Sequence, residues 1–251
     1  MTAYHGGKSR LGKQISQHIN FVCQMLREEQ GIKISGYCEP FVGMAGVYQH
    51  IPTLFKDLPK KLTYKAGDTN ESIIKMWQRA QKGWKPPITC TQEEYDRLKD
   101  AAPSALKGYI GHQYSFGGQF LMGYAPKYGK TVDSSKASSR VQNISKILQD
   151  VKFTHGDYTQ FSTLKGYVIY CDPPYENTSQ RYKNTKDKYS FNTEDFFEWC
   201  RGMIRNNNVI FLSSYQAPKD FIEIMSSSHK LTGVIHSNAD KKRTEKLYML
   251  I

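Results

Sequence analysis

Apolar positions along the chain follow two different spacings, one typical of helices and one typical of strands. Between positions 11 and 26 they recur every three or four residues, which predicts an amphipathic helix. These positions are Leu11, Ile15, Ile19, Val22 and Leu26. A strand pattern is also present over 151–158, and the apolar runs within 167–171 and 208–215 are typical of buried strands. Together the runs predict an α/β domain in which helices cover a largely parallel sheet.

Later segments are expected to complete this sheet. An amphipathic helix is predicted over 191–205, capped by Asn192 or Thr193. Residues 221–225 are expected in a further helix.

Two early strands are expected to end in turns suited to a ligand. Residues 36–47 predict a strand, a glycine-rich turn and a helix start, in which Gly43 and Gly46 let the backbone approach a ligand. The turn lacks the three glycines of the dinucleotide fingerprint, which disfavours NAD or FAD. Asp68 ends the next strand, where it either accepts hydrogen bonds from ribose hydroxyls or caps the helix that begins at Glu71.

The segment before the first helix, 4–10, contains Gly6, Gly7 and Lys8. Backbone N–H groups at a helix start, with a cation beside them, suit a ligand carboxylate. A flexible loop before the helix is the alternative.

Residues Asp172-Pro173-Pro174-Tyr175 directly follow the apolar run over 167–171. The prolines end the strand because neither has an N–H to donate, so a carboxylate and a ring are held in a rigid turn at its carboxyl end. Asp172 and the Pro173 carbonyl could accept hydrogen bonds from an exocyclic amine while Tyr175 stacks on its ring. This arrangement favours methylation of an amino nitrogen. A strand-terminating turn is the alternative.

Residues 75–150 interrupt the alternation of strands and helices with Gly, Pro and Ser breaks. Twelve Lys and Arg against six Asp and Glu give this segment a charge of +6, half of the excess of the whole chain. Within it, 114–130 interleaves aromatic rings with glycines and lysines, which suits a surface that contacts phosphates and wedges into or stacks on bases. A solvated basic insertion with a small core of its own is the alternative.

The charge of the whole chain indicates a polyanionic partner. It has 35 Lys and Arg against 23 Asp and Glu, a net charge of +12 and a pI near 9.3. The five cysteines are odd in number and form no Cys-x-x-Cys pair, so neither a zinc site nor a disulfide framework is expected. With no signal peptide and no apolar run of transmembrane length, we expect a soluble, cytoplasmic protein without a metal or a membrane partner.

The motif at 172–175 resembles the catalytic motif of DNA amino-methyltransferases, and the order of the other motifs resembles Dam-type adenine-N6 DNA methyltransferases. The resemblance implies a class I S-adenosylmethionine-dependent methyltransferase fold, with a mixed seven-stranded, Rossmann-like sheet. Two segments, 231–236 and 245–251, resemble the hairpin that closes such a sheet and would place an antiparallel strand in it. It also implies a catalytic domain formed by 1–74 and 151–251, and an inserted DNA target-recognition domain at 75–150.

The resemblance also implies roles for single residues. Catalytic roles are implied for Asp172, Pro173, Pro174 and Tyr175. Contacts with S-adenosylmethionine are implied for Tyr4, Gly7, Lys8, Glu39, Pro40, Phe41, Gly43, Ala45, Gly46, Asp68, Asp157, Tyr158 and Asp172. The glycine turn departs from the family pattern in one place, because its second glycine comes one residue later and Ala45 fills the slot. DNA contacts are expected at Tyr114, Phe116, Lys127, Lys130, Arg140, Arg181 and Lys183.

The implied function is site-specific methylation of adenine N6 in double-stranded DNA, by a monomer or weak dimer that flips the target base out of the duplex. The Asp form of the motif usually accompanies adenine in such families. Cytosine-N4 or RNA adenine methylation stays open as an alternative, as does a catalytically silent DNA-binding protein on the same fold. The recognition sequence and the presence of a cognate restriction endonuclease do not follow from the sequence.

Overall fold

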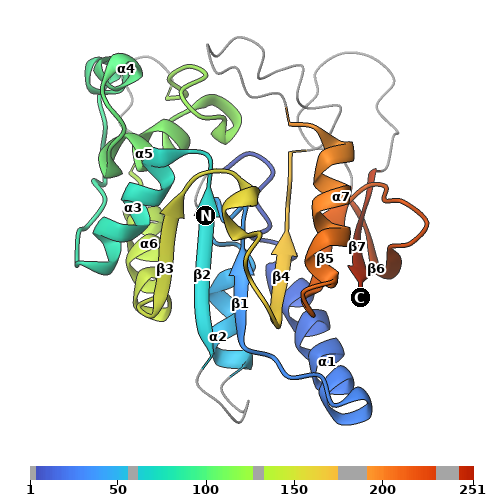
Figure 1. Ribbon diagram of the computed structural model, residues 1–251. Coiled ribbons are helices and arrows are strands. Elements are labelled where there is room, and N and C mark those ends of the chain that lie inside the picture. Colours follow the sequence, from blue (N-terminus) through green and yellow to red (C-terminus); the bar gives the residue numbers. More distant parts are fainter. Residues whose placement is uncertain (1–3, 56–61, 127–132, 175–190, 230–242) are drawn as a thin grey trace.

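The computed structural model describes residues 4–55, 62–126, 133–174, 191–229 and 243–251. In these segments seven strands form one mixed sheet in the order β3-β2-β1-β4-β5-β7-β6 (Figure 1). The strands are β1 (Gly36–Glu39), β2 (Thr63–Asp68), β3 (Val151–His155), β4 (Tyr167–Cys171), β5 (Val209–Ser214), β6 (Ile222–His229) and β7 (Arg243–Leu250). The helices are α1 (Gly12–Gln30), α2 (Ile51–Leu54), α3 (Glu71–Gln81), α4 (Gln92–Asp100), α5 (Ala105–Gln113), α6 (Ser135–Ile147) and α7 (Thr193–Ile204). Short 3₁₀ turns are η1 (Tyr48–His50), η2 (Phe116–Gly118) and η3 (Tyr158–Phe161).

The parallel strands share one functional edge. β3, β2, β1, β4 and β5 run parallel, so that their carboxyl ends lie on the same side of the sheet. β7 is antiparallel to both β5 and β6. This mixed seven-stranded α/β sheet is the class I methyltransferase fold, which confirms the fold expected from the sequence.

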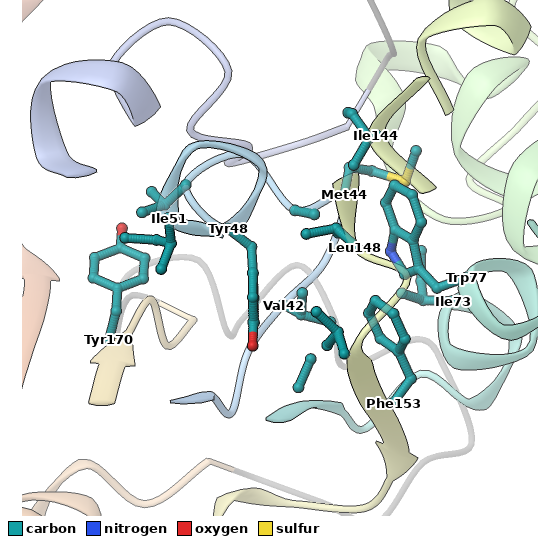
Figure 2. Close-up of a cluster of buried hydrophobic side chains, with 14 of the residues drawn as sticks. Val42, Met44, Tyr48, Ile51, Ile73, Trp77, Ile144, Leu148, Phe153 and Tyr170 are labelled. Carbon is teal, nitrogen blue, oxygen red and sulfur yellow. The ribbon is translucent and has the colours of Figure 1, made fainter. Parts of the chain in front are cut away.

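Side chains of the central strands alternate between two cores. Val168 and Tyr170 of β4 face the layer formed by α1, α2, α3 and α6, whereas Ile169 faces α7 on the opposite side. Figure 2 shows the first of these cores, in which the rings of Trp77 and Phe153 stack with centroids 6.0 Å apart. Burial on both faces explains why the central strands appear as continuous apolar runs in the sequence.

Helix boundaries follow local capping signals. Asn70 caps α3 by accepting a hydrogen bond from the Ser72 N–H, and Asn192 caps α7 by accepting one from the Glu194 N–H. Thr91 opens α4 with a complete capping box. No helix in the described segments combines the length and the apolar character that crossing a membrane requires.

The closing strands differ from the expectation for 221–225. These residues do not form a helix, because β6 begins at Ile222 and pairs with Met249 of β7. The backbone groups of this segment are thus satisfied by the sheet rather than by a helix. The expected antiparallel hairpin exists, but its first strand is β6, and residues 231–236 lie outside the described segments.

Helix α3 crosses the predicted boundary between the catalytic domain, which includes 1–74, and the inserted domain at 75–150. Its Trp77 is buried in the core that also contains residues of the sheet. α5 packs closely on α3, since a Cβ added at Gly108 would lie 2.2 Å from the Ser72 carbonyl oxygen. The described residues of 75–150 therefore extend the core of the sheet rather than surround a separate one. α4, α5 and the loop after α5 lie beyond the carboxyl ends of β2 and β3 (Figure 1), and the domain division stays a prediction.

Candidate functional site

Three acidic residues gather at the carboxyl edge of the parallel strands. Glu39 ends β1, Asp68 ends β2, and Asp172 directly follows β4. β1 lies between β2 and β4 in the sheet, so the three strand ends are neighbours. Ligands of open α/β sheets bind at this edge.

Lys8 holds the carboxylate of Asp172. Its Nζ lies 2.6 Å from Asp172 Oδ1 and 3.2 Å from Glu245 Oε1, and it donates a hydrogen bond to the Gly6 carbonyl at 3.1 Å. The side chain of Lys8 is 6% exposed, and those of Asp172 and Glu245 are 17% and 15% exposed, so water screens these ion pairs little. The carboxylate therefore has a fixed orientation just before Pro173.

Glu39 is a buried carboxyl group near Asp172. Burial raises the pKa of Glu39 well above its usual range, a hydrogen bond from the Tyr37 hydroxyl lowers it, and the charge of Asp172 raises it again. The hydroxyl lies 2.8 Å from Oε1 of Glu39. The net effect favours a protonated Glu39, which is able to donate as well as accept a hydrogen bond.

The glycine turn after β1 is built around Tyr4 and Asp68. Gly43 has a φ of 45°, and a Cβ at this position would lie 2.7 Å from ring atoms of Tyr4. Its N–H donates to Asp68 Oδ2 at 2.9 Å, and its carbonyl accepts from Trp77 Nε1 at 2.8 Å. Ala45, in the slot where the family pattern has glycine, also has a positive φ, 54°. The turn therefore keeps a glycine-like backbone with one strained alanine.

Asp68 accepts two backbone hydrogen bonds. They come from Gly43 and from the Asn70 N–H, which lies 2.8 Å from Oδ1. Burial raises the pKa of Asp68, and the two backbone bonds lower it. Each carboxylate oxygen has two lone pairs, so acceptor capacity remains for ribose hydroxyls. The cap of α3 is Asn70, which contradicts the alternative in which Asp68 is the cap.

The start of α1 packs directly on the glycine turn. A Cβ added at Gly12 would lie 2.0 Å from the Gly46 carbonyl oxygen, and one at Gly46 would lie 3.1 Å from the Lys8 backbone. The Gly7 N–H donates to the Tyr4 carbonyl at 3.2 Å. These contacts fix Lys8 relative to the turn, and the expected ligand contacts of Gly7 and Gly46 stay predictions.

Phe41 and Tyr158 form part of an aromatic cluster on the α7 side of the sheet. Their ring centroids are 5.9 Å apart, and Tyr158 lies 5.1 Å from the ring of Trp199. Burial raises the pKa of Tyr158. Asp157 is exposed and caps η3 by accepting a hydrogen bond from the Thr159 N–H at 2.9 Å. Apolar ring surface and an exposed carboxylate thus lie beside each other at Tyr158 and Asp157. Pro40, the residue before Phe41, is buried.

The residues expected to contact DNA fall into three groups. Tyr114 is 1% exposed, and its hydroxyl lies 2.6 Å from Ser134 Oγ, so it is a core residue and the expected surface contact is corrected. Phe116 is 76% exposed, whereas Arg140 lies half-buried on α6. Other expected residues lie outside the described segments, namely Lys127, Lys130, Tyr175, Arg181 and Lys183.

Two residues at the site were not anticipated from the sequence. Glu245 contacts Lys8 from β7, and no local pattern marks it. His112 packs against Tyr4, with ring centroids 4.6 Å apart, and burial lowers the pKa of His112 to about 4. The His5 N–H donates to the Gly118 carbonyl at 3.1 Å. The loop after α5 is therefore joined to the N-terminal segment that carries Lys8.

Neither a metal nor a reactive cysteine marks the site. Within the described segments, no group of three or more His, Cys, Asp or Glu could hold a metal ion. All five cysteines are buried and free. Burial raises the pKa of Cys171, next to Asp172, well above its usual range, so this residue stays a neutral thiol.

Comparison with known proteins gives a family match and distant structural likenesses. The family model described as D12 class N6 adenine-specific DNA methyltransferase matches residues 121–248, just over half of the chain. A search of curated proteins finds no match. Two solved structures of the rRNA methyltransferase aviRa from Streptomyces viridochromogenes are similar at 10% and 11% identity, with TM-scores of 0.34 and 0.37. The matches cover 92% and 96% of this chain, and 84% of the other chain in each case.

Proposed function

The chain belongs to the D12 class of N6 adenine-specific DNA methyltransferases, and we propose that it transfers a methyl group from S-adenosylmethionine to adenine N6 at specific sites in double-stranded DNA. The observation that carries this proposal is the ion pair of Lys8 and Asp172 at the carboxyl end of β4. It holds an acceptor in a fixed orientation next to a rigid Pro-Pro turn.

Asp172 acts as a hydrogen-bond acceptor for the reacting amine. Its carboxylate and the Pro173 carbonyl accept hydrogen bonds from the amino group of adenine and orient the nitrogen lone pair toward the methyl donor. Lys8 fixes the carboxylate through Oδ1 before the base arrives, so little reorganisation is needed in the transition state. Stacking of Tyr175 on the base stays a prediction from the sequence.

S-adenosylmethionine, when bound, supplies a methyl group on a positively charged sulfur. The carboxyl edge fits such a ligand, because Gly43 has no side chain and Asp68 keeps acceptor capacity for the ribose. The half-buried rings of Phe41 and Tyr158 offer a surface for the adenine. Tyr4 lies close to the glycine turn at Gly43, and the backbone of Lys8 lies close to it at Gly46.

DNA is the acceptor that fits the remaining features. The amino group of adenine cannot be reached while the base is stacked, so the base must leave the duplex. The chain carries a net charge of +12 for phosphate contacts. Exposed Phe116 lies in the loop that is joined to the N-terminal segment, and its ring suits stacking on a base or insertion beside it.

The first test is methyl transfer to unmethylated DNA of mixed sequence from labelled S-adenosylmethionine, followed by digestion to nucleosides. Label in N6-methyladenine is expected, and sequencing of the product would then give the recognition site. Label in N4-methylcytosine would overturn the base assignment, and label only in RNA would overturn the choice of nucleic acid. No label in either, with DNA still bound, would leave the silent DNA-binding protein.

The second test addresses Asp172. Asp172→Asn should lower kcat at least about 100-fold, because it removes a charged acceptor that acts in the transition state. DNA affinity should change little, since affinity resides mainly in phosphate contacts. Asp100→Asn is the matched control, because Asp100 is exposed at the end of α4. Equal turnover of the two variants would overturn the assigned role of Asp172.

A further inference from the structure

A groove of about 650 Å³ lies on the helical layer that covers one face of the sheet. One wall is α6, and the other is the start of α1 together with η1. Its volume falls within the range of about 300–1,000 Å³ that is common for ligand sites. Neither Asp172 nor the ligand residues Gly43 and Asp68 line it, so the groove is distinct from the carboxyl-edge site.

The titratable residues that line the groove are all basic. Lys13 comes from α1, His50 from η1, and Lys136 and Arg140 from α6. Burial lowers the pKa of His50, and the positive charges of Arg140 and Lys13 lower it further. The acidic residue that faces Lys136 is Asp133, which does not line the groove.

Arg140 lines the groove and also carries a buried donor that is unsatisfied. Its Nε is buried and has no hydrogen-bond partner among the described residues. A buried donor without a partner costs free energy, and the cost is larger when the group is charged. An anion in the groove would compensate the charge of Arg140 and reduce the repulsion between Arg140 and Lys13, which both act on His50.

The neutral lining indicates which anion fits. Ser139 and Asn143 of α6 add polar groups beside the cations, while Ile147, which is 44% exposed, adds an apolar patch. Basic groups spread over two walls suit several phosphates in a row, and the apolar patch suits the sugars between them. A single small anion would contact only part of such a surface.

We propose that the groove between α6 and the α1–η1 wall binds the phosphodiester backbone of nucleic acid, as a site separate from the carboxyl-edge site. The choice of nucleic acid rests on the proposed function. The groove adds a second basic surface to the expected DNA contacts, and Arg140 belongs to this surface.

The test compares two double variants of the full chain. Lys13→Gln with Arg140→Gln removes two charges from the groove, whereas Lys33→Gln with Lys146→Gln removes two exposed charges that do not line it. DNA binding is measured without S-adenosylmethionine at several salt concentrations. For the groove variant, the slope of log Kd against log salt should fall by about 1.8, which raises Kd roughly tenfold or more near 0.1 M salt. The control variant should keep the salt dependence of the unchanged protein.

Three outcomes decide the proposal, and methyl transfer by the unchanged protein is assayed separately. Equal salt slopes for both double variants would overturn it. Unchanged DNA binding by the groove variant would also overturn it if tripolyphosphate stabilises the unchanged protein against heat but does not stabilise this variant, because the groove would then bind a small phosphate compound. A reduced slope for the groove variant alone supports it, even if methyl transfer to DNA is not found. Failure of the proposed function would instead appear as DNA binding without transfer.

Discussion

The ammonium group of Lys8 lies 2.6 Å from Oδ1 of Asp172, although 164 positions separate the two residues in the chain. A second carboxylate, Glu245, lies 3.2 Å from the same ammonium group. The ammonium group of Lys8 therefore balances two carboxylates, one directly after β4 and one on β7. The arrangement predicts strong coupling among these three residues.

Lys8→Met should lower the free energy of unfolding by roughly 3 kcal/mol, because it leaves two largely buried carboxylates without their cation. Combining it with Glu245→Gln should cost less than the sum of the single changes, by about 1–2 kcal/mol. Urea unfolding of the two single variants and the double variant measures this coupling. Lys75→Met is the control, since its pair with Glu71 is exposed on α3, and it should change stability little. Additive effects of Lys8→Met and Glu245→Gln would contradict the coupling.

Gly43→Ala should destabilise the protein and weaken S-adenosylmethionine binding. The new Cβ would lie 2.7 Å from the ring of Tyr4, and the φ of 45° is unfavourable for alanine. We expect a loss of about 2 kcal/mol or more in unfolding free energy, from strain and displacement of Tyr4. Gly202→Ala in α7 should instead stabilise by up to about 1 kcal/mol, because no atom lies within 4 Å of its added Cβ. Thermal unfolding and calorimetric titration measure the pair, and similar effects of the two changes would exclude this explanation.

Lowering the pH should destabilise the protein through protonation of His112, at pH values above those at which carboxylates titrate. Burial lowers the pKa of His112 to about 4, below the value of about 6.5 expected in the unfolded chain. The unfolded state therefore binds a proton first, and the contribution of His112 is complete above pH 6.5 and lost as the pH falls toward 4. It amounts to about 3 kcal/mol.

His112→Phe keeps an aromatic ring between Tyr4 and Phe120 but has no titratable group. Its unfolding free energy should fall less than that of the unchanged protein between pH 6.5 and 4.5. His50→Gln removes a second histidine whose pKa is lowered, and its curve of unfolding free energy against pH is compared with that of His112→Phe. Parallel stability curves for His112→Phe and the unchanged protein would show that His112 is not the group responsible.

Phe116→Ala should weaken DNA binding without a loss of stability. The ring is 76% exposed, so its removal leaves no cavity, whereas a stacked base would lose about 1–3 kcal/mol of contact energy. Kd for DNA should rise about 5- to 100-fold. Phe21→Ala, which removes a ring that is 60% exposed on α1, is the control and should leave Kd unchanged. Fluorescence anisotropy with a short duplex compares the two variants.

Patterns confined to a few neighbouring residues predicted much of the fold. The strand before Asp172, the strand that ends at Asp68 and the cap at Asn192 are all present, because each depends on local apolar runs or local hydrogen bonds. Residues 221–225 form a strand instead of a helix, since pairing with β7 outweighs the local apolar spacing. Residues 221–225 resemble a helix only when they are considered without their partner strand, β7.

Long-range contacts at the site could not be predicted. Tyr114 appeared suited to a surface because glycines and lysines surround it in the sequence, but its hydroxyl bonds to Ser134 inside the core. The pairing of Lys8 with Glu245 depends on which strand lies beside β5, and the sequence near Glu245 contains no sign of it. Such contacts depend on tertiary structure, for which one sequence gives little information.

The position of β7 between β5 and β6 determines when the site becomes complete during synthesis. The five parallel strands can associate before β6 and β7 have emerged from the ribosome, but Lys8 meets Glu245 only after β7 has emerged. A single proteolytic cut within β7 would separate this second carboxylate from Lys8 while leaving most of the apolar core in place. We therefore expect a newly made chain to be compact before Lys8 has both of its carboxylate partners, and a nicked chain to stay compact after Lys8 has lost one of them.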